Sequence, residues 1–282
     1  MQQSRWLPYA LIAPATIFLV ALFVAPLVQT ILLSFNDGAA FGLGNYARMV
    51  GDLNFAPALR NTFLLVAVII PVQLALALGM GLMIQKMTRG RDLIMWVWTI
   101  PLGISDLAAG LVWLAILQNS GYLNSMLYGL GLLGGPTAWL NAESPVTLFI
   151  GIAIAETWRA TAIVLIILVA GMQLIPKEFA EAADIFGATP WVKLRRITLP
   201  LLKPSIQSAL ILRTVLAFEV FAVVYALGGR NFPVIVGEAF VWQHDNQNYG
   251  VAAAYAVLVM LISLAATAVY LVALREKPEA QA

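Results

Sequence analysis

The chain has 282 residues, of which 61% are hydrophobic and 11% charged, with a formal net charge of +2. A soluble globular domain is usually about half apolar and a quarter charged, so this surface is expected to face lipid rather than water. The charge balance is too weak to indicate a nucleic-acid partner. The absence of cysteine excludes disulfide bonds and thiolate metal sites.

Six segments are apolar enough to cross a bilayer as helices, which takes about 20 residues each. Helices are expected because lipid offers the backbone no hydrogen-bond partners. The first segment is not expected to be a signal peptide. Its uncharged run is far longer than the apolar region of a signal peptide, which usually has about 7–15 residues. The predicted spans are Leu7–Phe35, Thr62–Gln85, Leu93–Leu117, Pro145–Gln173, Ser205–Leu227 and Val251–Leu274.

The basic residues of the loops predict the orientation, because Lys and Arg gather on the cytoplasmic side of a membrane. Eleven of them lie in the two terminal segments and in residues 86–91 and 177–203, against three in residues 36–61, 118–144 and 228–250. Both termini, and the long loop between the fourth and fifth spans, are therefore expected in the cytoplasm.

That long loop, residues 175–204, is the most charged part of the chain and predicts two short helices joined by a turn. Pro176 suits the first turn of a helix, and Gly187 lies where that helix would end in a left-handed turn. Thr189-Pro190 restarts a helix, with Thr as the N-cap and Pro at the first position. Leu199-Pro200 is expected to stop this second helix.

Part of this loop resembles the EAA loop of binding-protein-dependent ABC importers. That pattern has Glu-Ala-Ala, a glycine after three residues, an isoleucine after nine more, and a Leu-Pro pair. The resemblance implies a coupling helix that docks on a separate ATPase, with the glutamate as polar anchor and the glycine as turn. An amphipathic loop on lipid headgroups is the alternative, and the adjacent alanines fit it poorly. Every position is present: Glu181, Ala182, Ala183, Gly187, Ile197, Leu199 and Pro200.

The resemblance extends along nearly the whole chain to maltose-type carbohydrate permeases, for instance at Leu43–Tyr46, Leu59–Thr62 and Gly121–Asn124. It implies an all-α membrane protein with the type I ABC importer permease fold, in the cytoplasmic (inner) membrane. The implied partners are an ATP-binding cassette ATPase dimer, a second homologous permease subunit, an extracytoplasmic solute-binding protein and a carbohydrate substrate. No cofactor is expected in this chain, since ATP and Mg would be bound by the ATPase.

The predicted organisation has three parts. Residues 1–57 form the N-terminal transmembrane helix and the first extracytoplasmic loop. Residues 58–274 form the permease core of five helices, with the EAA coupling loop at 176–200. Residues 275–282 form a short cytoplasmic tail.

Ionisable residues inside the spans are costly in lipid, by at least about 2.5–3.5 kcal/mol each on insertion scales. They should face the bundle interior and pair there. Glu156 and Arg159 are three apart on one helix and can form an ion pair. Arg213 and Glu219 are six apart, so we expect them not to face one partner directly. Such residues either line a polar translocation site or hold the helices together, and Asp106, near the end of its span, favours the second role.

The resemblance to maltose-type permeases also implies where a substrate would pass. Its pocket residues come from the fourth and fifth spans, and their positions are counted from the EAA loop. Aromatic side chains, Trp158 and Trp113, would supply a face for a sugar ring. The candidate pathway residues are Glu156, Trp158, Arg159, Ala160, Arg213, Leu216, Ala217 and Glu219.

The chain departs from the family at two of these positions. Many relatives carry an acid where Leu216 stands and a base where Glu219 stands. The substrate is therefore open: a di- or oligosaccharide is the first expectation, with a monosaccharide, a polyol or glycerol phosphate as alternatives. The membrane charges suit an acidic sugar derivative, and an internal ion pair explains them equally well.

An enzyme is not expected. The chain has no Gly-x-x-x-x-Gly-Lys-Ser/Thr motif and no catalytic constellation, and the lone histidine, His244, has too few neighbours for a metal site. Two other functions remain open: an ion-driven secondary transporter that uses the membrane charges as a relay, and a non-transporting scaffold. The complete EAA pattern favours the importer, because an ion-driven carrier does not need that loop.

Overall fold

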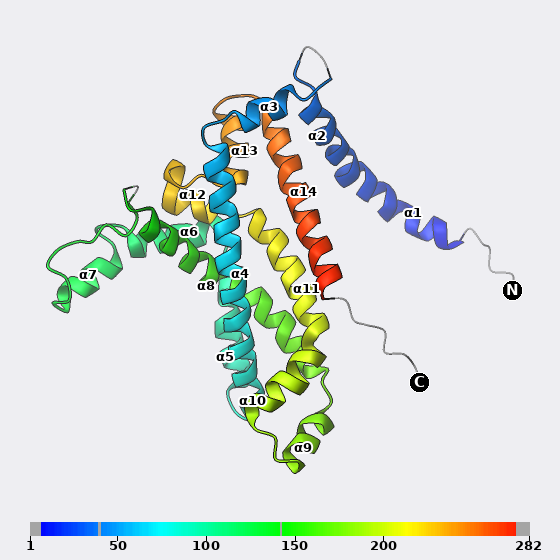
Figure 1. Cartoon of the computed structure of the whole chain (residues 1–282), viewed down its shortest axis with the longest axis vertical. Coiled ribbons are helices and arrows are strands. Elements are labelled where there is room, and N and C mark those ends of the chain that lie inside the picture. The colour runs from blue at the N-terminus through cyan, green and yellow to red at the C-terminus, as the bar shows by residue number, and fades with distance from the viewer. Residues whose placement is uncertain (1–6, 39–40, 142, 275–282) are drawn as a thin grey trace. The chain divides into compact units, whose positions relative to one another are not determined.

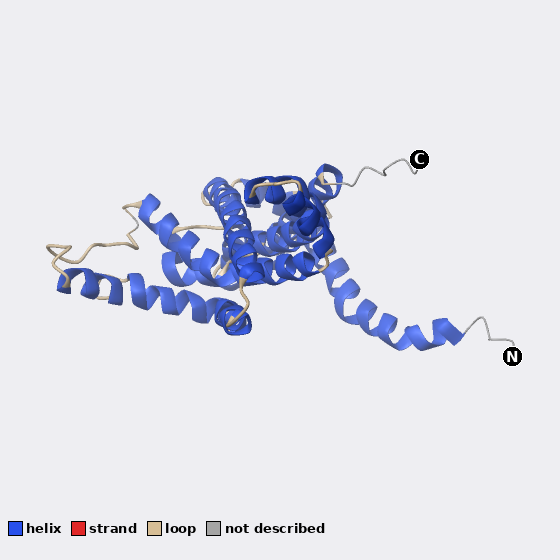
Figure 2. Ribbon diagram, turned by 90° about the horizontal axis from the view of Figure 1, so that it is seen from below, coloured by secondary structure: helices blue, strands red, loops and turns tan. Residues whose placement is uncertain are grey.

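The computed structural model describes residues 7–38, 41–141 and 143–274. They form helices joined by loops (Figure 2), and their one strand-like feature is an isolated bridge between Asn36 and Phe41. The predicted all-α class is therefore confirmed. Arg5 and the predicted tail 275–282 lie outside the described residues.

Long apolar helices account for the predicted spans (Figure 1). Four are long and apolar enough to cross a membrane unaided, and two bent helix pairs raise the number to six if each pair is one span. The first span is α1 continued through a π-helical turn into α2. The unaided spans comprise α1 (Leu7–Leu19) with the turn Val20–Val24 and α2 (Ala25–Phe35), then α4 (Phe55–Lys86), α8 (Pro145–Gln173) and α14 (Tyr249–Ala273).

The remaining helices build the bent spans and the connections. Short 3-10 turns cover Ile100–Gly103 and Gly229–Asn231, and a second π-helical turn covers Leu194–Thr198. The other α-helices are α3 (Gly44–Val50), α5 (Arg91–Thr99), α6 (Asp106–Leu117), α7 (Tyr122–Gly129), α9 (Lys177–Ile185), α10 (Pro190–Lys193), α11 (Leu199–Phe218), α12 (Ala222–Gly228) and α13 (Ile235–His244).

The third predicted span is broken rather than continuous. The α5 segment and the helical segment that starts with α6 are bent by 100°. Pro101 follows Ile100 in the short turn, and its ring removes one backbone donor from the helix. Ser105 then caps α6, because its hydroxyl accepts a hydrogen bond from the Ala108 N–H at 3.2 Å. These local features end one helix and start the next in a new direction.

The prediction that Leu199-Pro200 stops the second loop helix is wrong. The chain passes from α10 through Leu194–Thr198 directly into α11, with a bend of 68° along the way. The Leu199 N–H bonds to the carbonyl of Leu194, five residues earlier. Proline lacks an N–H and its ring crowds the carbonyl four residues before it, so a widened turn lets the helix continue past Pro200.

A π-helical turn before a proline also occurs in the first span. There the Ala25 N–H bonds to the carbonyl of Val20, and Pro26 follows at once. Each π-helical turn thus ends two residues before a proline. The proline positions predict where these helices widen, not where they end.

The fifth span ends earlier than predicted. Its helix stops at Phe218, and α12 is a separate helix after a break at Glu219–Phe221. The apolar run continues to Leu227, so hydropathy alone does not reveal the break. In the structure α12 packs on α6 and α8 instead of extending α11.

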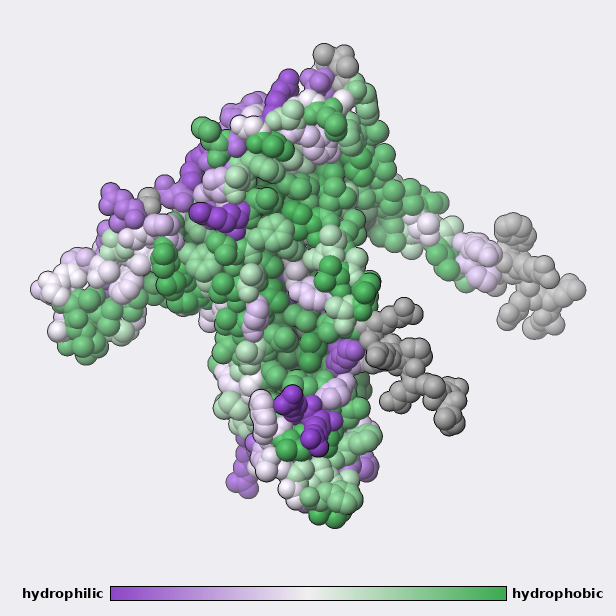
Figure 3. Space-filling view, in the orientation of Figure 1, coloured by the Kyte–Doolittle hydropathy of each residue, from purple (hydrophilic) through white to green (hydrophobic). Residues whose placement is uncertain are grey.

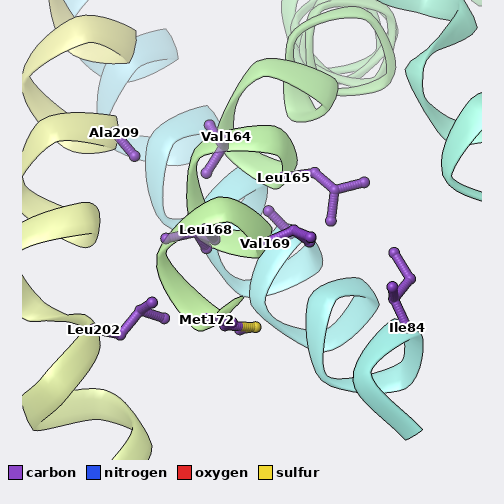
Figure 4. Close-up of a cluster of buried hydrophobic side chains, with 9 residues drawn as sticks. Ile84, Val164, Leu165, Leu168, Val169, Met172, Leu202 and Ala209 are labelled. Carbon is purple, nitrogen blue, oxygen red and sulfur yellow. The ribbon is translucent and has the colours of Figure 1, made fainter. Parts of the chain in front are cut away.

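The chain divides into two compact units, one formed by the first 56 residues with Val236–Leu261 and one by Pro57–Ile235 with the residues from Ile262 on. The second unit has an apolar core in which α8 lies between α11 and α4 (Figure 4). Its buried members are Ala77, Ile84, Val164, Leu165, Leu168, Val169, Met172, Leu202 and Ala209.

A glycine sets the distance between α8 and α11. A Cβ placed on Gly171 would overlap the Oγ of Ser205 and would lie 3.0 Å from a methyl group of Leu202. Small residues at helix interfaces let membrane helices approach closely. The contact brings the backbones together near the ends of the two helices that join the EAA loop.

The first unit is held by polar contacts near residue 45. The Asn45 side-chain amide donates to the carbonyls of Asn36 at 2.8 Å and Ser34 at 3.2 Å. The Ser34 hydroxyl also hydrogen-bonds the Tyr46 hydroxyl at 2.8 Å. These bonds fix α3 against the end of α2.

Candidate translocation site and coupling loop

A buried carboxylate, Glu156, lies at the centre of the second unit. Its side chain on α8 has no exposed surface. Arg213 on α11 donates to it from Nη2 at 2.7 Å, and Arg159 on α8 donates from Nη2 at 3.0 Å and from Nε at 3.3 Å. The expected pairing of Glu156 with Arg159 is confirmed. The second arginine comes from another helix, so the pair also ties α8 to α11.

Arg159 extends the network to a third helix. Its Nη1 lies 2.8 Å from Asp106 Oδ1. Asp106 is the first residue of α6, where a carboxylate is favoured by the helix dipole. The side chain of Asp106 is 48% exposed and that of Arg159 is 16% exposed. The network therefore runs from a fully buried carboxylate to one that solvent or a ligand can reach.

Gln73 on α4 completes the network. It accepts a hydrogen bond from Arg213 Nε at 2.8 Å and donates to the backbone carbonyl of Glu156 at 3.1 Å. Gln73 was not among the residues predicted from the sequence, because an uncharged side chain carries no large insertion cost. A glutamine within an apolar run is nevertheless a usable signal, since a polar group buried in a span needs a partner.

The exposed side of the network opens into a small cavity. Its water-accessible volume is about 190 Å³. Five of the eight predicted pathway residues line it, together with one further residue of α8, one of α6 and one of the turn that precedes α6. The lining residues are Leu102, Asp106, Arg159, Ala160, Ile163, Arg213, Leu216 and Glu219.

Glu219 lies at the C-terminal end of α11, directly after Phe218. It is six residues from Arg213, yet both side chains line the same cavity. They do not share an ion-pair partner among the described residues.

Three of the predicted pathway residues do not line this cavity. Glu156 is behind the cavity wall, and Ala217 is completely buried in helix packing. Trp158 contacts Trp113 edge to face, with ring centroids 6.0 Å apart. The two aromatic residues thus pack on each other, and neither lines the 190 Å³ cavity. The cavity lining thus lacks three predicted residues and gains Leu102, Asp106 and Ile163.

The turn between the two helices of the EAA loop has the predicted local structure. The first helix, α9, ends before Gly187, whose φ of +69° is left-handed and favours glycine. Thr189 caps the second helix, with its hydroxyl accepting from the Val192 N–H at 3.4 Å. Lys193 Nζ lies 2.6 Å from Asp184 Oδ1 and joins the two helices across the turn.

Large apolar side chains stand out at the tip of this loop. Ile185 is 85% exposed and Phe186 is 89% exposed, and Glu181 on the same helix is exposed. Figure 3 shows hydrophilic residues gathered around α9 and α10, whereas the visible surface over α4 and α11 is mainly hydrophobic. A polar loop that presents apolar side chains at its tip is suited to contact another protein.

These features define a class: a helical membrane subunit of a transport system, with charges paired between its spans and an exposed loop of EAA type. The chain belongs to the family of inner membrane components of binding-protein-dependent transport systems, whose model matches residues 73–275. The family places it in the inner membrane as a multi-pass protein.

Individual relatives support this assignment over most of the chain. The trehalose transport system permease protein SugA of Mycobacterium tuberculosis is 32% identical over 91% of this chain and 84% of its own length. The trehalose/maltose transport system permease protein MalF of Thermococcus litoralis is 30% identical over 94% of this chain and 92% of its own.

A solved structure has the same fold. It is a bacterial ABC transporter involved in the import of the acidic polysaccharide alginate. The TM-score is 0.83, the identity 23%, and the match covers 97% of this chain and 96% of that one. The predicted type I permease fold is confirmed.

Proposed function

We propose that this chain is the permease subunit of an ATP-driven importer that moves a carbohydrate across the cytoplasmic membrane. The observation that carries the proposal is the EAA loop, in which every residue of the pattern is present and the two helices turn at a left-handed Gly187. Such a loop transmits movement from a separate ATPase. An ion-driven carrier, the alternative, has no use for it.

The substrate class rests on the relatives. Two permeases that match over nine-tenths of this chain carry names of trehalose or trehalose/maltose systems. A sugar needs hydrogen-bond donors and acceptors around its hydroxyl groups and apolar surface against its ring. The cavity beside Arg159 and Arg213 offers both, and we assign it to the translocation pathway.

The remaining partners follow from the mechanism. Two ATPase subunits would close on ATP beneath the membrane and pull the EAA loop through Glu181, Ile185 and Phe186. The loop joins α8 to α11, the two helices that carry Glu156 and Arg213, so its movement reaches the cavity directly. A solute-binding protein would dock on the opposite face, and a homologous permease would form the other half of the pathway.

The orientation belongs to this proposal. Both termini and the EAA loop would face the cytoplasm, as the distribution of Lys and Arg predicts. Residues 36–61, 118–144 and 228–250 would then face outward and receive the binding protein. A protease that cleaves the EAA loop in inverted but not in right-side-out vesicles would support this arrangement.

The experiment is purification of the tagged chain from the cells that produce it, followed by reconstitution into proteoliposomes. Copurification of an ATPase is expected, and uptake of labelled trehalose or maltose should require ATP and continue when ion gradients are collapsed. Uptake that needs a proton or sodium gradient and no ATP would refute the importer.

Two matched substitutions test the loop. Glu181→Lys should abolish ATP-dependent uptake and weaken recovery of the ATPase. Glu178→Lys, on the same helix and also exposed, introduces the same charge change outside the EAA pattern and should retain most of the uptake. Equal loss in both variants would show that loop charge, not the EAA position, is responsible.

A further inference from the structure

Among the described residues, those that line the cavity at the charge network offer no unpaired cation to an acidic ligand. Arg213 is paired with Glu156, and Arg159 is shared between Glu156 and Asp106. The side chains of Arg159 and Arg213 are therefore already neutralised within the protein. Binding a carboxylate, sulfate or phosphate group would require breaking one of these pairs.

One more carboxylate adds negative charge to the cavity. Glu219 lines the same cavity, is exposed, and has no ion-pair partner among the described residues. The two arginines thus face three carboxylates in all: Asp106, Glu156 and Glu219. An anion entering the cavity would meet net negative charge, and placing like charges together is unfavourable.

Arg213 offers the cavity little besides its paired charge. Its Nε and Nη2 are used in hydrogen bonds to Gln73 and Glu156. Its Nη1 has no hydrogen-bond partner within the described residues and almost no accessible surface. An acidic ligand in the cavity therefore has no exposed donor of Arg213 to bind.

The rest of the lining suits a single sugar ring. Apolar surface in the same cavity comes from Leu102, Ala160, Ile163 and Leu216. The volume of about 190 Å³ is below the range of about 300–1,000 Å³ that is usual for drug-sized ligands. This portion of the pathway fits one ring at a time rather than a whole oligosaccharide.

We propose that this cavity selects an uncharged sugar ring and excludes acidic sugars, with Asp106 and Glu219 as the carboxylates that repel an anion. The inference rests on the proposed carbohydrate import and narrows its substrate class. Asp106 and Glu219 are the residues that determine this specificity for charge.

The test uses three rings of the same size and different charge: glucose, glucuronate and protonated glucosamine. Each is titrated against the purified transporter assembly without solute-binding protein, at constant ionic strength, and binding is measured by equilibrium dialysis of the labelled ring. Glucose is expected to bind at least about tenfold more tightly than glucuronate, because the latter brings like charges together.

Three variants test which residues cause the difference in affinity between glucose and glucuronate. Asp106→Asn with Glu219→Gln should narrow the difference between glucose and glucuronate to less than about threefold, as the repelling charges are gone. Glu143→Gln removes an exposed carboxylate that does not line the cavity and should leave the difference unchanged. Leu216→Trp, at a position 39% exposed, should fill the cavity and abolish binding of all three rings.

Glucuronate binding as tightly as glucose, no binding of glucose, or protonated glucosamine binding more weakly than glucuronate would overturn the inference. So would unchanged selectivity in the Asp106 and Glu219 double variant. These outcomes differ from failure of the proposed import, which would appear as uptake without an ATP requirement whichever ring binds. ATP-dependent uptake together with tight glucuronate binding would refute only the charge selection.

Discussion

Arg213 and Glu156 are 57 residues apart in the sequence, and their side chains meet at 2.7 Å between α11 and α8. Both are almost completely buried. The pair lies within the two helices that the EAA loop connects. The pair therefore links the two helices attached to the EAA loop at the wall of the cavity.

Breaking this pair should destabilise the fold. Glu156→Leu leaves Arg213 as a buried charge with fewer partners, and removal of one member of a buried pair costs about 3–5 kcal/mol. We expect the variant to show a lower unfolding midpoint in detergent, measured by thermal or chemical denaturation of the purified chain.

The double variant provides the control. Glu156→Leu combined with Arg213→Met removes both charges and replaces them with apolar side chains, which is often neutral or stabilising. It should recover most of the lost stability even if transport is lost. A double variant less stable than either single variant would contradict this account of the pair.

Gly171 permits the close approach of α8 and α11. A side chain there would overlap the Ser205 hydroxyl, and overpacking of this kind costs about 1–3 kcal/mol or more. Gly171→Leu should therefore lower the unfolding midpoint strongly. Gly79→Leu is the matched control, since Gly79 also lies in a helix and has no atoms within 4 Å of a built Cβ. Equal midpoints for the two variants would refute the packing argument.

The ion pair between Lys193 and Asp184 should matter for coupling more than for stability. The Asp184 side chain is 63% exposed, and exposed salt bridges contribute about 0–1 kcal/mol. Lys193→Asp should leave the unfolding midpoint nearly unchanged but reduce ATP-dependent uptake, because the two loop helices lose their cross-connection. Adding Asp184→Lys restores an opposite-charge pair and should recover uptake. A variant with full uptake and no pair would show that this connection is dispensable.

Asn124 should hold the loop that follows α7. Its side chain accepts from the Thr137 N–H at 3.1 Å and the Trp139 indole at 2.9 Å, and donates to the Thr137 carbonyl at 2.8 Å. Leaving such buried partners unpaired costs about 1–3 kcal/mol. Asn124→Ala should increase amide hydrogen exchange in residues 130–140, with Ser125→Ala, which loses one local bond to Gly121, as the control. Unchanged exchange would mean that other contacts hold the loop.

The sequence by itself predicted the helical membrane class, because apolar runs of about 20 residues have no other stable form in lipid. It also predicted the local structure of the EAA loop, since Gly187, Thr189 and Pro190 act through their own backbone preferences. The ion pair of Glu156 with Arg159 was predictable for a similar reason: the two residues are one helical turn apart.

Only the tertiary structure decided which helices meet. The contact of Arg213 with Glu156, the role of Gln73 and the link from Arg159 to Asp106 all join separate spans, and no local rule relates such positions. The break at Glu219–Phe221, after which α12 packs on α6 and α8, is likewise not reported by hydropathy. The charge balance of the cavity follows from those contacts, because a charge is free or neutralised according to the partner that packing places beside it.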